Sequence, residues 1–145
     1  MKKRSLTIAL AIVVFAGLAT TSAYSATLRV APISVRAAHG TSTASVRIWN
    51  DGREPLNVQV RIFRWRVEKG KDILEPTRDV VVSPPMTTLI PGTENLVRIV
   101  RTTSRPVSEQ ENYRLIVDQL PKAAGKGKSG TISILLRHAI PVYFE

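Results

Sequence analysis

Apolar and polar residues alternate with a period of two along most of the chain after residue 27. The pattern is clearest over residues 44–49 and 56–63, where an apolar side chain occupies every second position. A period of two is typical of strands that bury one face. Helical periodicity is nearly absent from the same part of the chain. The pattern therefore predicts an all-β protein.

Turn-forming residues separate the alternating runs. They include Asn50-Asp51-Gly52, Gly70, the pair Pro84-Pro85 and the pair Pro91-Gly92. The strands predicted between them cover residues 28–36, 44–49, 56–63, 80–82, 86–90, 96–101, 113–120 and a last run from Thr131. Seven to eight strands in about 120 residues predict an immunoglobulin-like β-sandwich.

The first 25 residues differ in composition from the rest. Three basic residues at positions 2–4 precede an almost unbroken apolar run over 6–19, and small residues follow it. This order is typical of a secretory signal peptide, here with cleavage after Ser25. The run is shorter than the roughly 20 apolar residues of a membrane span, which makes a retained anchor the weaker alternative. We therefore expect a signal peptide over 1–25, a domain over 26–145 and a periplasmic location.

Basic residues outnumber acidic ones. The chain has 21 Lys and Arg against 11 Asp and Glu, and 18 of the basic residues follow the expected cleavage site, which leaves that part a net charge of about +7. Such a surface attracts nucleic acid, acidic lipid or acidic protein, and export makes nucleic acid the least suitable of the three. The chain has no cysteine, so the exported domain must hold by packing alone.

Residue types that carry catalysis or bind metals are sparse. His39 and His138 are the only histidines and no cysteine can join them, so we expect no metal site. The serines show no nucleophile elbow, and no carboxylates are paired at a useful spacing. The run over 125–130 lacks the glycine that a phosphate-binding loop needs five residues before its Gly-Lys-Ser. We therefore expect neither an enzyme nor a cofactor.

The run RIFRWRVEKGK, residues 61–71, interleaves aromatic and basic side chains. Such a run can stack nucleic-acid bases and hold phosphates. The alternative is one strand with core residues on one face and a solvated basic face. Export favours this alternative, so we expect no nucleic-acid partner.

The last residues, TISILLRHAIPVYFE, predict a closing strand that begins at Thr131 and is apolar on both faces. Such a strand is rarely left at a free edge, because its unpaired backbone groups recruit other chains. The residues alone leave open whether it packs inside its own sandwich or pairs with another chain, a second copy included.

Several motifs follow one another in a specific order. Residues 82–102, VSPPMTTLIPGTENLVRIVRT, run from a Pro-Pro corner through Leu-x-Pro-Gly into a strand that carries arginine. Residues 111–121, ENYRLIVDQLP, lead from an acidic residue to Leu-Pro, and residues 46–60 contain an Asn turn. Together with the closing strand, this order resembles the N-terminal domain of the periplasmic pilus-assembly chaperones of the chaperone-usher pathway. The resemblance covers residues 28–144, and the run over 61–76 is nearer to the non-classical branches.

The resemblance implies a function. Members of this family bind pilus or fimbrial subunits whose immunoglobulin-like fold lacks a strand, and pass them to an outer-membrane usher. The last strand of the chaperone's first domain pairs into the gap, so that backbone hydrogen bonds hold the subunit and alternate side chains fill its pockets. Matched residue by residue, Ile132, Ile134 and Leu136 are the donor positions.

The family also anchors the terminal carboxylate of the subunit with two basic residues, since a carboxylate that leaves water needs charged donors. Its lysine of the last strand corresponds to Pro141 here. We expect Arg137 as the substitute, with Arg98 or Arg36 as its partner; Arg36 aligns with the arginine of the family's first strand only after a one-residue slip. The alternative for each arginine is a solvated surface charge.

Family members carry a second domain after this strand, whereas this sequence ends at Glu145. We therefore expect the first domain alone, and a truncated, non-functional fragment is one alternative. The other is a secreted immunoglobulin-like binding or structural module whose basic face meets anionic surfaces. Binding through scattered charge would fade as salt rises, while strand pairing would persist.

Overall fold

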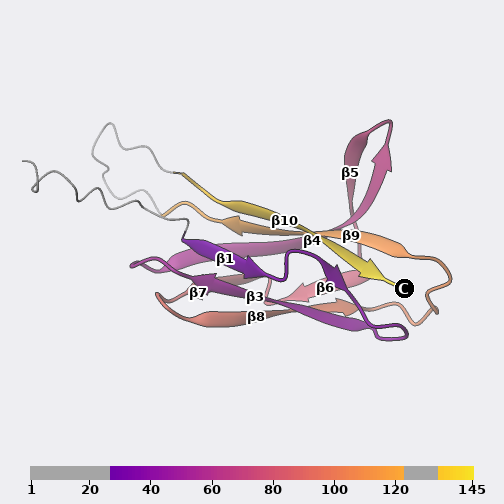
Figure 1. Ribbon diagram of the computed structural model, residues 1–145, viewed down its shortest axis with the longest axis horizontal. Helices are drawn as coiled ribbons and strands as arrows, with labels where there is room; N and C mark the ends of the chain where they lie inside the picture. Colours follow the sequence, from indigo (N-terminus) through magenta and orange to yellow (C-terminus); the bar gives the residue numbers. More distant parts are fainter. Residues whose placement is uncertain (1–26, 123–133) are drawn as a thin grey trace, which may run out of the picture.

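The computed structural model describes residues 27–122 and 134–145, which form strands and loops without a helix (Figure 1). No helix in this part of the chain could therefore cross a membrane. The ten strands are β1 (Leu28–Ala31), β2 (Val35–Arg36), β3 (Thr43–Asn50), β4 (Leu56–Glu68), β5 (Lys71–Pro76), β6 (Val80–Ser83), β7 (Met86–Leu89), β8 (Glu94–Arg101), β9 (Glu111–Gln119) and β10 (Arg137–Phe144).

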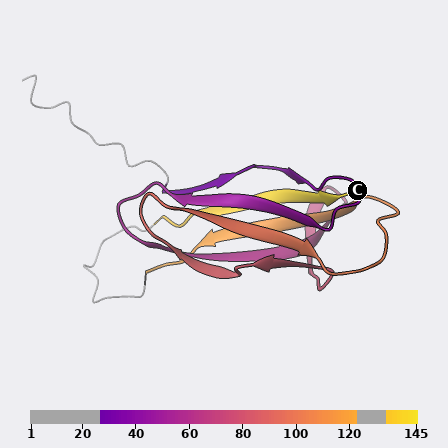
Figure 2. The same cartoon turned by 90° about the horizontal axis from the view of Figure 1, so that it is seen from below.

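The strands form two sheets that pack face to face. One has four strands in the order β1-β3-β8-β6, and the other has the order β2-β10-β9-β4-β5, with β7 also paired to β4. All pairs are antiparallel except β2 with β10. The end of β10 and the connection from β8 to β9 lie at the same end of the sandwich (Figure 2). The prediction of an all-β, immunoglobulin-like sandwich is confirmed.

Two segments raise the strand count above the seven to eight that the sequence predicts. Residues 28–36, predicted as one strand, divide into β1 in the four-stranded sheet and β2 in the six-stranded sheet. The division falls at Pro32, which has no N–H to give to a ladder. The predicted strand over 56–63 instead continues to Glu68 and returns as β5.

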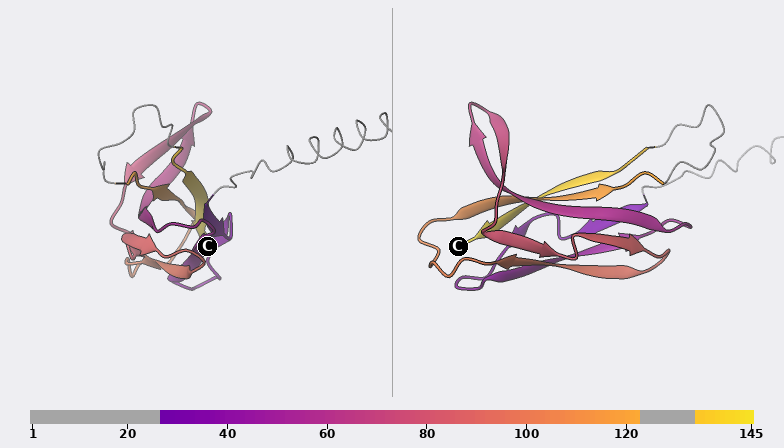
Figure 3. Two further views of the ribbon diagram at one scale, coloured as in Figure 1. Left: turned by 90° about the vertical axis from the view of Figure 1, so that its left-hand side faces the viewer. Right: turned by 180° about the vertical axis from the view of Figure 1, so that it is seen from behind.

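The predicted turn at Gly70 closes this longer hairpin. Lys69 and Gly70 both have positive φ angles, 51° and 75°, as in the two-residue turns that match the twist of a hairpin. The far part of β4 and β5 stands away from the sandwich (Figure 3). The far part of this hairpin is an exposed pair of strands at the β5 edge of the six-stranded sheet.

Alternate side chains of both sheets fill one core. Tyr113 and Phe144 are fully buried and pack edge to face, with ring centroids 5.9 Å apart. Most of the other core side chains follow the period of two along their strands: Leu28, Val30, Val46, Ile48, Leu56, Val58, Val60, Val97, Ile99, Leu115, Val117, Ile140 and Val142. Even-numbered residues of β10 thus face the core and odd-numbered residues face outward.

The Asn-Asp-Gly turn is held by a buried side chain. The Asn50 amide nitrogen donates to the carbonyl oxygens of Glu54 and Leu89, at 2.7 and 2.9 Å, and its oxygen accepts from the Gly52 N–H at 2.9 Å. The Asn50 side chain is fully buried. One residue therefore ties together the β3–β4 turn and the end of β7, as the turn signal predicts for this position.

Candidate functional site: the open edge of the last strand

The strand β10 is paired along one side only. It pairs with β9 over its whole length, from Arg137 opposite Asp118 to Phe144 opposite Glu111. On the other side it pairs with β2 at Val142 and Tyr143 only. Within the described residues, positions 137–141 have no strand partner on that side. An unpaired row of backbone groups of this kind is a template for another strand.

Two hydrogen bonds fix which backbone groups face the open side. The Leu136 oxygen accepts from the Gln119 N–H of β9, whereas the Tyr143 oxygen accepts from the Ala37 N–H beyond β2, both at 2.9 Å. Because backbone groups alternate between the two sides of a strand, odd-numbered residues of β10 present their N–H and C=O to the open edge. Arg137 and Ala139 thus offer a donor and an acceptor each, and Pro141 offers only its carbonyl.

The predicted donor positions lie at or before the start of this strand. Ile132 lies outside the described residues. Ile134 is 77% exposed and Leu136 is half-buried against the core. Residues 134–136 are not in a strand, so within the described residues the closing strand begins at Arg137 rather than at the expected Thr131.

Arg137 shares a buried carboxylate with a second arginine. Its Nε donates to Asp118 Oδ1 at 2.5 Å, and Arg61 Nη2 of β4 donates to Asp118 Oδ2 at 2.6 Å. Asp118 is 8% exposed. Burial opposes ionisation of this carboxyl, but the two guanidinium groups outweigh burial and lower the pKa of Asp118. Asp118 therefore stays ionised and holds both arginines at the start of β10.

The other two predicted anchor residues lie elsewhere. Arg36 stacks over the Tyr143 ring at 4.5 Å and forms an ion pair with Glu145. It is opposite Tyr143, about 20 Å along β10 from Arg137 at roughly 3.4 Å per residue. Arg98 lies between the buried Val97 and Ile99, so its side chain is on the outer face of the four-stranded sheet. The structure brings no two of the three predicted arginines together.

The basic and aromatic run of β4 is arranged differently from the prediction. Phe63 and Trp65 share the outer face of the six-stranded sheet with Arg61, because the core positions of β4 are the even-numbered residues up to Ile62. Arg61 lies over the Phe63 ring at 5.6 Å, and Arg114 of β9 lies over Trp65 at 3.8 Å. The expected division into a core face and a basic face is therefore wrong, since aromatic rings and guanidinium groups pack together on the solvent side.

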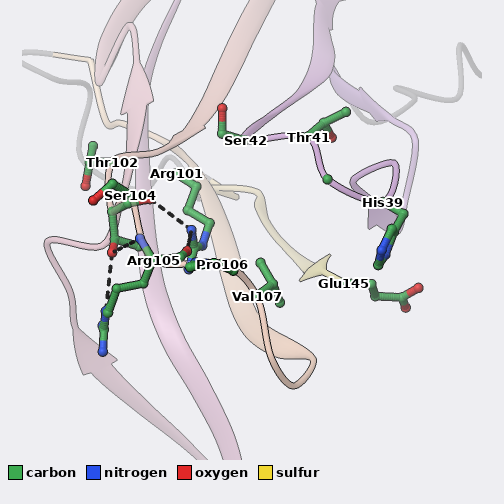
Figure 4. Close-up of a pocket in the computed structure, with 12 residues that line it drawn as sticks. His39, Thr41, Ser42, Arg101, Thr102, Ser104, Arg105, Pro106, Val107 and Glu145 are labelled. Atoms are coloured by element: carbon green, nitrogen blue, oxygen red, sulfur yellow. Dashed lines mark hydrogen bonds between the residues drawn. The ribbon is translucent and has the colours of Figure 1, made fainter.

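A second charged cluster lies at the opposite end of the sandwich. Arg101 forms a two-pronged ion pair with Glu111, and the Tyr113 hydroxyl donates to Glu111 at 3.0 Å. Burial and this hydrogen bond raise the pKa of Tyr113 to about 12. Beside the cluster is a hollow of about 510 Å³, lined by residues 39–42, 101–107 and Glu145 (Figure 4). These residues converge from three separate segments of the chain.

Sequence reasoning missed Arg61 and Asp118. Alternation placed Arg61 on the solvent face, but it could not show which charge of a neighbouring strand it meets. Asp118 carried a signal, because it is the one charge within the apolar run that ends β9. A lone carboxylate in such a run needs a cationic partner when it is buried.

The family model for "Pili and flagellar-assembly chaperone, PapD N-terminal domain" matches residues 27–145. Chaperone protein CssC of Escherichia coli is 25% identical over 118 residues, which covers 76% of this chain and 48% of that protein. The chain thus spans about half the length of this relative.

Solved structures agree with this match. The CsuC–CsuE chaperone–tip adhesion subunit complex of archaic Csu pili from Acinetobacter baumannii superposes with a TM-score of 0.70 at 25% identity, over 82% of this chain and 56% of that one. The SafB chaperone in complex with the SafA pilin of Salmonella enterica gives a TM-score of 0.63 at 19% identity, over 86% and 56% of the two chains. The second likeness shows the fold alone.

Proposed function

The chain belongs to the family of pilus and flagellar-assembly chaperones, and from that premise we propose that it captures pilus or fimbrial subunits by pairing them along the open edge of β10. In this proposal the chain is exported by its first 25 residues, works in the periplasm and passes the subunit to an outer-membrane usher. The CsuC–CsuE complex supports a subunit as the partner, since it contains a chaperone with a tip subunit.

One observation carries the proposal. Residues 137–141 have a strand partner on one side only, and the groups directed to the free side are those of Arg137, Ala139 and Pro141. A strand added there would receive hydrogen bonds from two N–H groups and give them to three carbonyls. The backbone thus offers a pairing surface that does not depend on the partner's sequence.

The side chains before β10 give the pairing its apolar part. Ile134 and Leu136 precede β10 and have the same parity in the sequence as Ile140, and so has Ile132. Burial of Ile134 in a subunit groove would contribute about 1.5–3 kcal/mol before the cost of ordering this segment, and the half-buried Leu136 would contribute less. The exposed Ile134 has the most to gain, because it is 77% exposed in the free chain.

A charged contact would complete the site. We propose Arg137 as a carboxylate contact beside the donor residues, because its side chain is 65% exposed while its Nε is held by Asp118. Arg36 is at the far end of β10 and would meet a different part of a subunit. Arg98, on the opposite outer face, has no place in this contact.

Co-purification with a pilus subunit of the same organism tests the proposal. Ile134→Asp should abolish capture without lowering the melting temperature, because Ile134 is exposed in the free chain. Ile90→Asp is the matched control, since Ile90 is 54% exposed in the turn after β7. Capture by the unaltered chain should persist at high salt, whereas binding by a basic face would fade. Equal capture by the two variants, or loss of capture at high salt, would contradict strand pairing.

A further inference from the structure

The strand β5 forms a second open edge, on the side of the six-stranded sheet that lies away from β2 and β10. It is the last strand in the order β2-β10-β9-β4-β5, so within the described residues it pairs with β4 alone. Together with the far part of β4 it stands away from the sandwich (Figure 3). A second strand can therefore approach β5 without meeting the body of the domain, and an open edge is a template for such a strand.

The hydrogen bonds of β4 show which groups of β5 face outward. The Val60 N–H donates to the Pro85 oxygen at 2.8 Å, on the side of β4 where β7 and β5 pair. Even-numbered residues of β4 thus bond toward β5, and the residues opposite them in β5 are odd-numbered. Asp72 and Leu74 therefore direct their N–H and C=O to the open edge. Pro76 directs only its carbonyl there.

Side chains on the outer face hold the hairpin in place. Arg114 of β9 donates to Asp72 of β5 at 3.1 Å and lies over the Trp65 ring at 3.8 Å. Trp65 in turn packs against Tyr143 of β10, with ring centroids 6.4 Å apart. Because β5 is held before a partner arrives, pairing along it loses little conformational freedom.

The hairpin is a neutral part of a basic chain. The part of the chain after the expected cleavage site has a net charge of about +7, but residues 66–76 contain three basic and three acidic side chains. These are Arg66, Lys69 and Lys71 against Glu68, Asp72 and Glu75. Repulsion between two copies is therefore smallest where their hairpins meet. Val67 and Leu74, 60% and 41% exposed, give the same surface an apolar part.

Three antiparallel registers bring outward-facing groups of β5 in two copies together about a twofold axis. They place Asp72, Ile73 or Leu74 opposite itself. With Asp72 opposite itself, like charges meet. With Leu74 opposite itself, Asp72 meets Pro76, which has no N–H for the Asp72 carbonyl. Only the register centred on Ile73 avoids both defects.

The register centred on Ile73 is self-complementary. Asp72 of one copy and Leu74 of the other exchange two hydrogen bonds, and symmetry repeats both at the other end. Lys71 of each copy lies opposite Glu75 of the other, which places opposite charges together twice. Edge charges usually protect a strand from pairing, but this order of charges favours pairing with a copy of itself.

We infer that β5 pairs antiparallel with β5 of a second copy of this chain, centred on Ile73, and forms a weak dimer. The interface is isologous and joins the two six-stranded sheets into one. It leaves β10 open in both copies, so the dimer offers two edges for capture and does not depend on the proposed function. The six residues of β5 are far fewer than the roughly 20–30 a side of a standard interface, which places the dimer among transient ones.

Sedimentation equilibrium of the full chain from about 10 µM to 1 mM tests the dimer, since this range covers the dissociation constants of weak interfaces. We expect a monomer–dimer equilibrium. Amide exchange measured by NMR should show Asp72 and Leu74 protected as the dimer forms, and Ile73, which already bonds to β4, unchanged. A monomer at every concentration, or a dimer in which the Asp72 and Leu74 amides stay unprotected, would overturn the inference.

Two charge reversals test the register. Lys71→Glu puts a carboxylate opposite Glu75 at both ends of the pairing, and Glu75→Lys puts an ammonium group opposite Lys71. Each variant alone should dimerise about tenfold more weakly than the unaltered chain at low salt. An equimolar mixture of the two should recover the dimer, because every cross-strand pair then joins opposite charges. A mixture that dimerises no better than its components would overturn the inference.

Proline substitutions distinguish the two open edges. Leu74→Pro removes an outward N–H of β5 and should abolish the dimer, whereas Ala139→Pro on β10 should leave dimerisation unchanged. Any other pattern in the folded variants would overturn the inference, and loss with Ala139→Pro alone would identify β10 as the edge that self-associates. If Leu74→Pro fails to fold, the mixture of charge-reversed variants decides the question, since both of those side chains lie on the exposed hairpin.

Discussion

Arg101 and Glu111 form a two-pronged ion pair that joins the two sheets, with Nε–Oε2 and Nη2–Oε1 distances of 2.9 and 2.8 Å. Arg101 is the last residue of β8 in the four-stranded sheet, and Glu111 is the first of β9 in the other. The Arg101 side chain is 5% exposed and also donates to the carbonyls of Thr103 and Arg105. The pair therefore fixes both the sheets and the connection between them.

Replacement of Glu111 by Gln should destabilise the fold, because it leaves the Arg101 charge buried without a counter-charge. We expect the free energy of unfolding to fall by about 2–3 kcal/mol, measured by urea unfolding followed by circular dichroism. Glu75→Gln is the control, since Glu75 pairs with Arg66 on the exposed hairpin and should change stability little. An equal loss of unfolding free energy in the two variants would show that the ion pair between the sheets stabilises the fold no more than the exposed pair does.

The same pair predicts a dependence of stability on pH. The hydrogen bond from Arg101 is the main cause that lowers the pKa of Glu111 below its ordinary value of 4.5, against an opposing effect of burial. A lowered carboxyl pKa in the folded state stabilises the fold above pH 4.5, and this stabilisation is lost as the pH falls through the folded-state value. The difference in melting temperature between the unaltered chain and Glu111→Gln should thus shrink from pH 7 to pH 3. A constant difference would contradict this origin.

A proline on the open edge should block subunit capture while sparing the fold. The Ala139 N–H faces the open side, so Ala139→Pro removes a donor for the partner strand and none of the bonds to β9. Ala139→Val keeps the N–H and is the matched control. We expect the dissociation constant for a pilus subunit to rise about tenfold or more for the proline variant only, the effect of a lost hydrogen bond and a blocked approach. Similar affinities in both variants would mean that the subunit binds elsewhere.

Much of the fold could be predicted from the sequence, because one-sided burial leaves a period of two and turns demand particular residues. The runs that contain Val46 and Val58 became β3 and β4, and Asn50 closes the turn between them. The division of residues 28–36 between two sheets could not be predicted, since it depends on which strands are neighbours. The extension of β4 beyond Phe63 was not predicted either, because the apolar residues there, Phe63, Trp65 and Val67, have the opposite parity to the core residues before them.

The candidate site was only partly accessible to sequence reasoning. Parity identifies which residues near β10 share a face, so Ile134 and Leu136 could be grouped with Ile140. The partner of Arg137 could not be found in this way, because Asp118 and Arg61 are brought together by the order of strands in the sheet. Matching to a family gave Arg98 or Arg36 as the partner of Arg137, but the fold places neither of them beside Arg137.

Amide hydrogen exchange of β10 tests the central claim most directly. In the free chain the Arg137 and Ala139 amides face the open edge and should exchange faster than the His138 and Ile140 amides, which face β9. Addition of a pilus subunit should protect Arg137 and Ala139 strongly and leave their neighbours unchanged. A subunit that binds tightly while these two amides exchange as in the free chain would contradict capture by strand pairing.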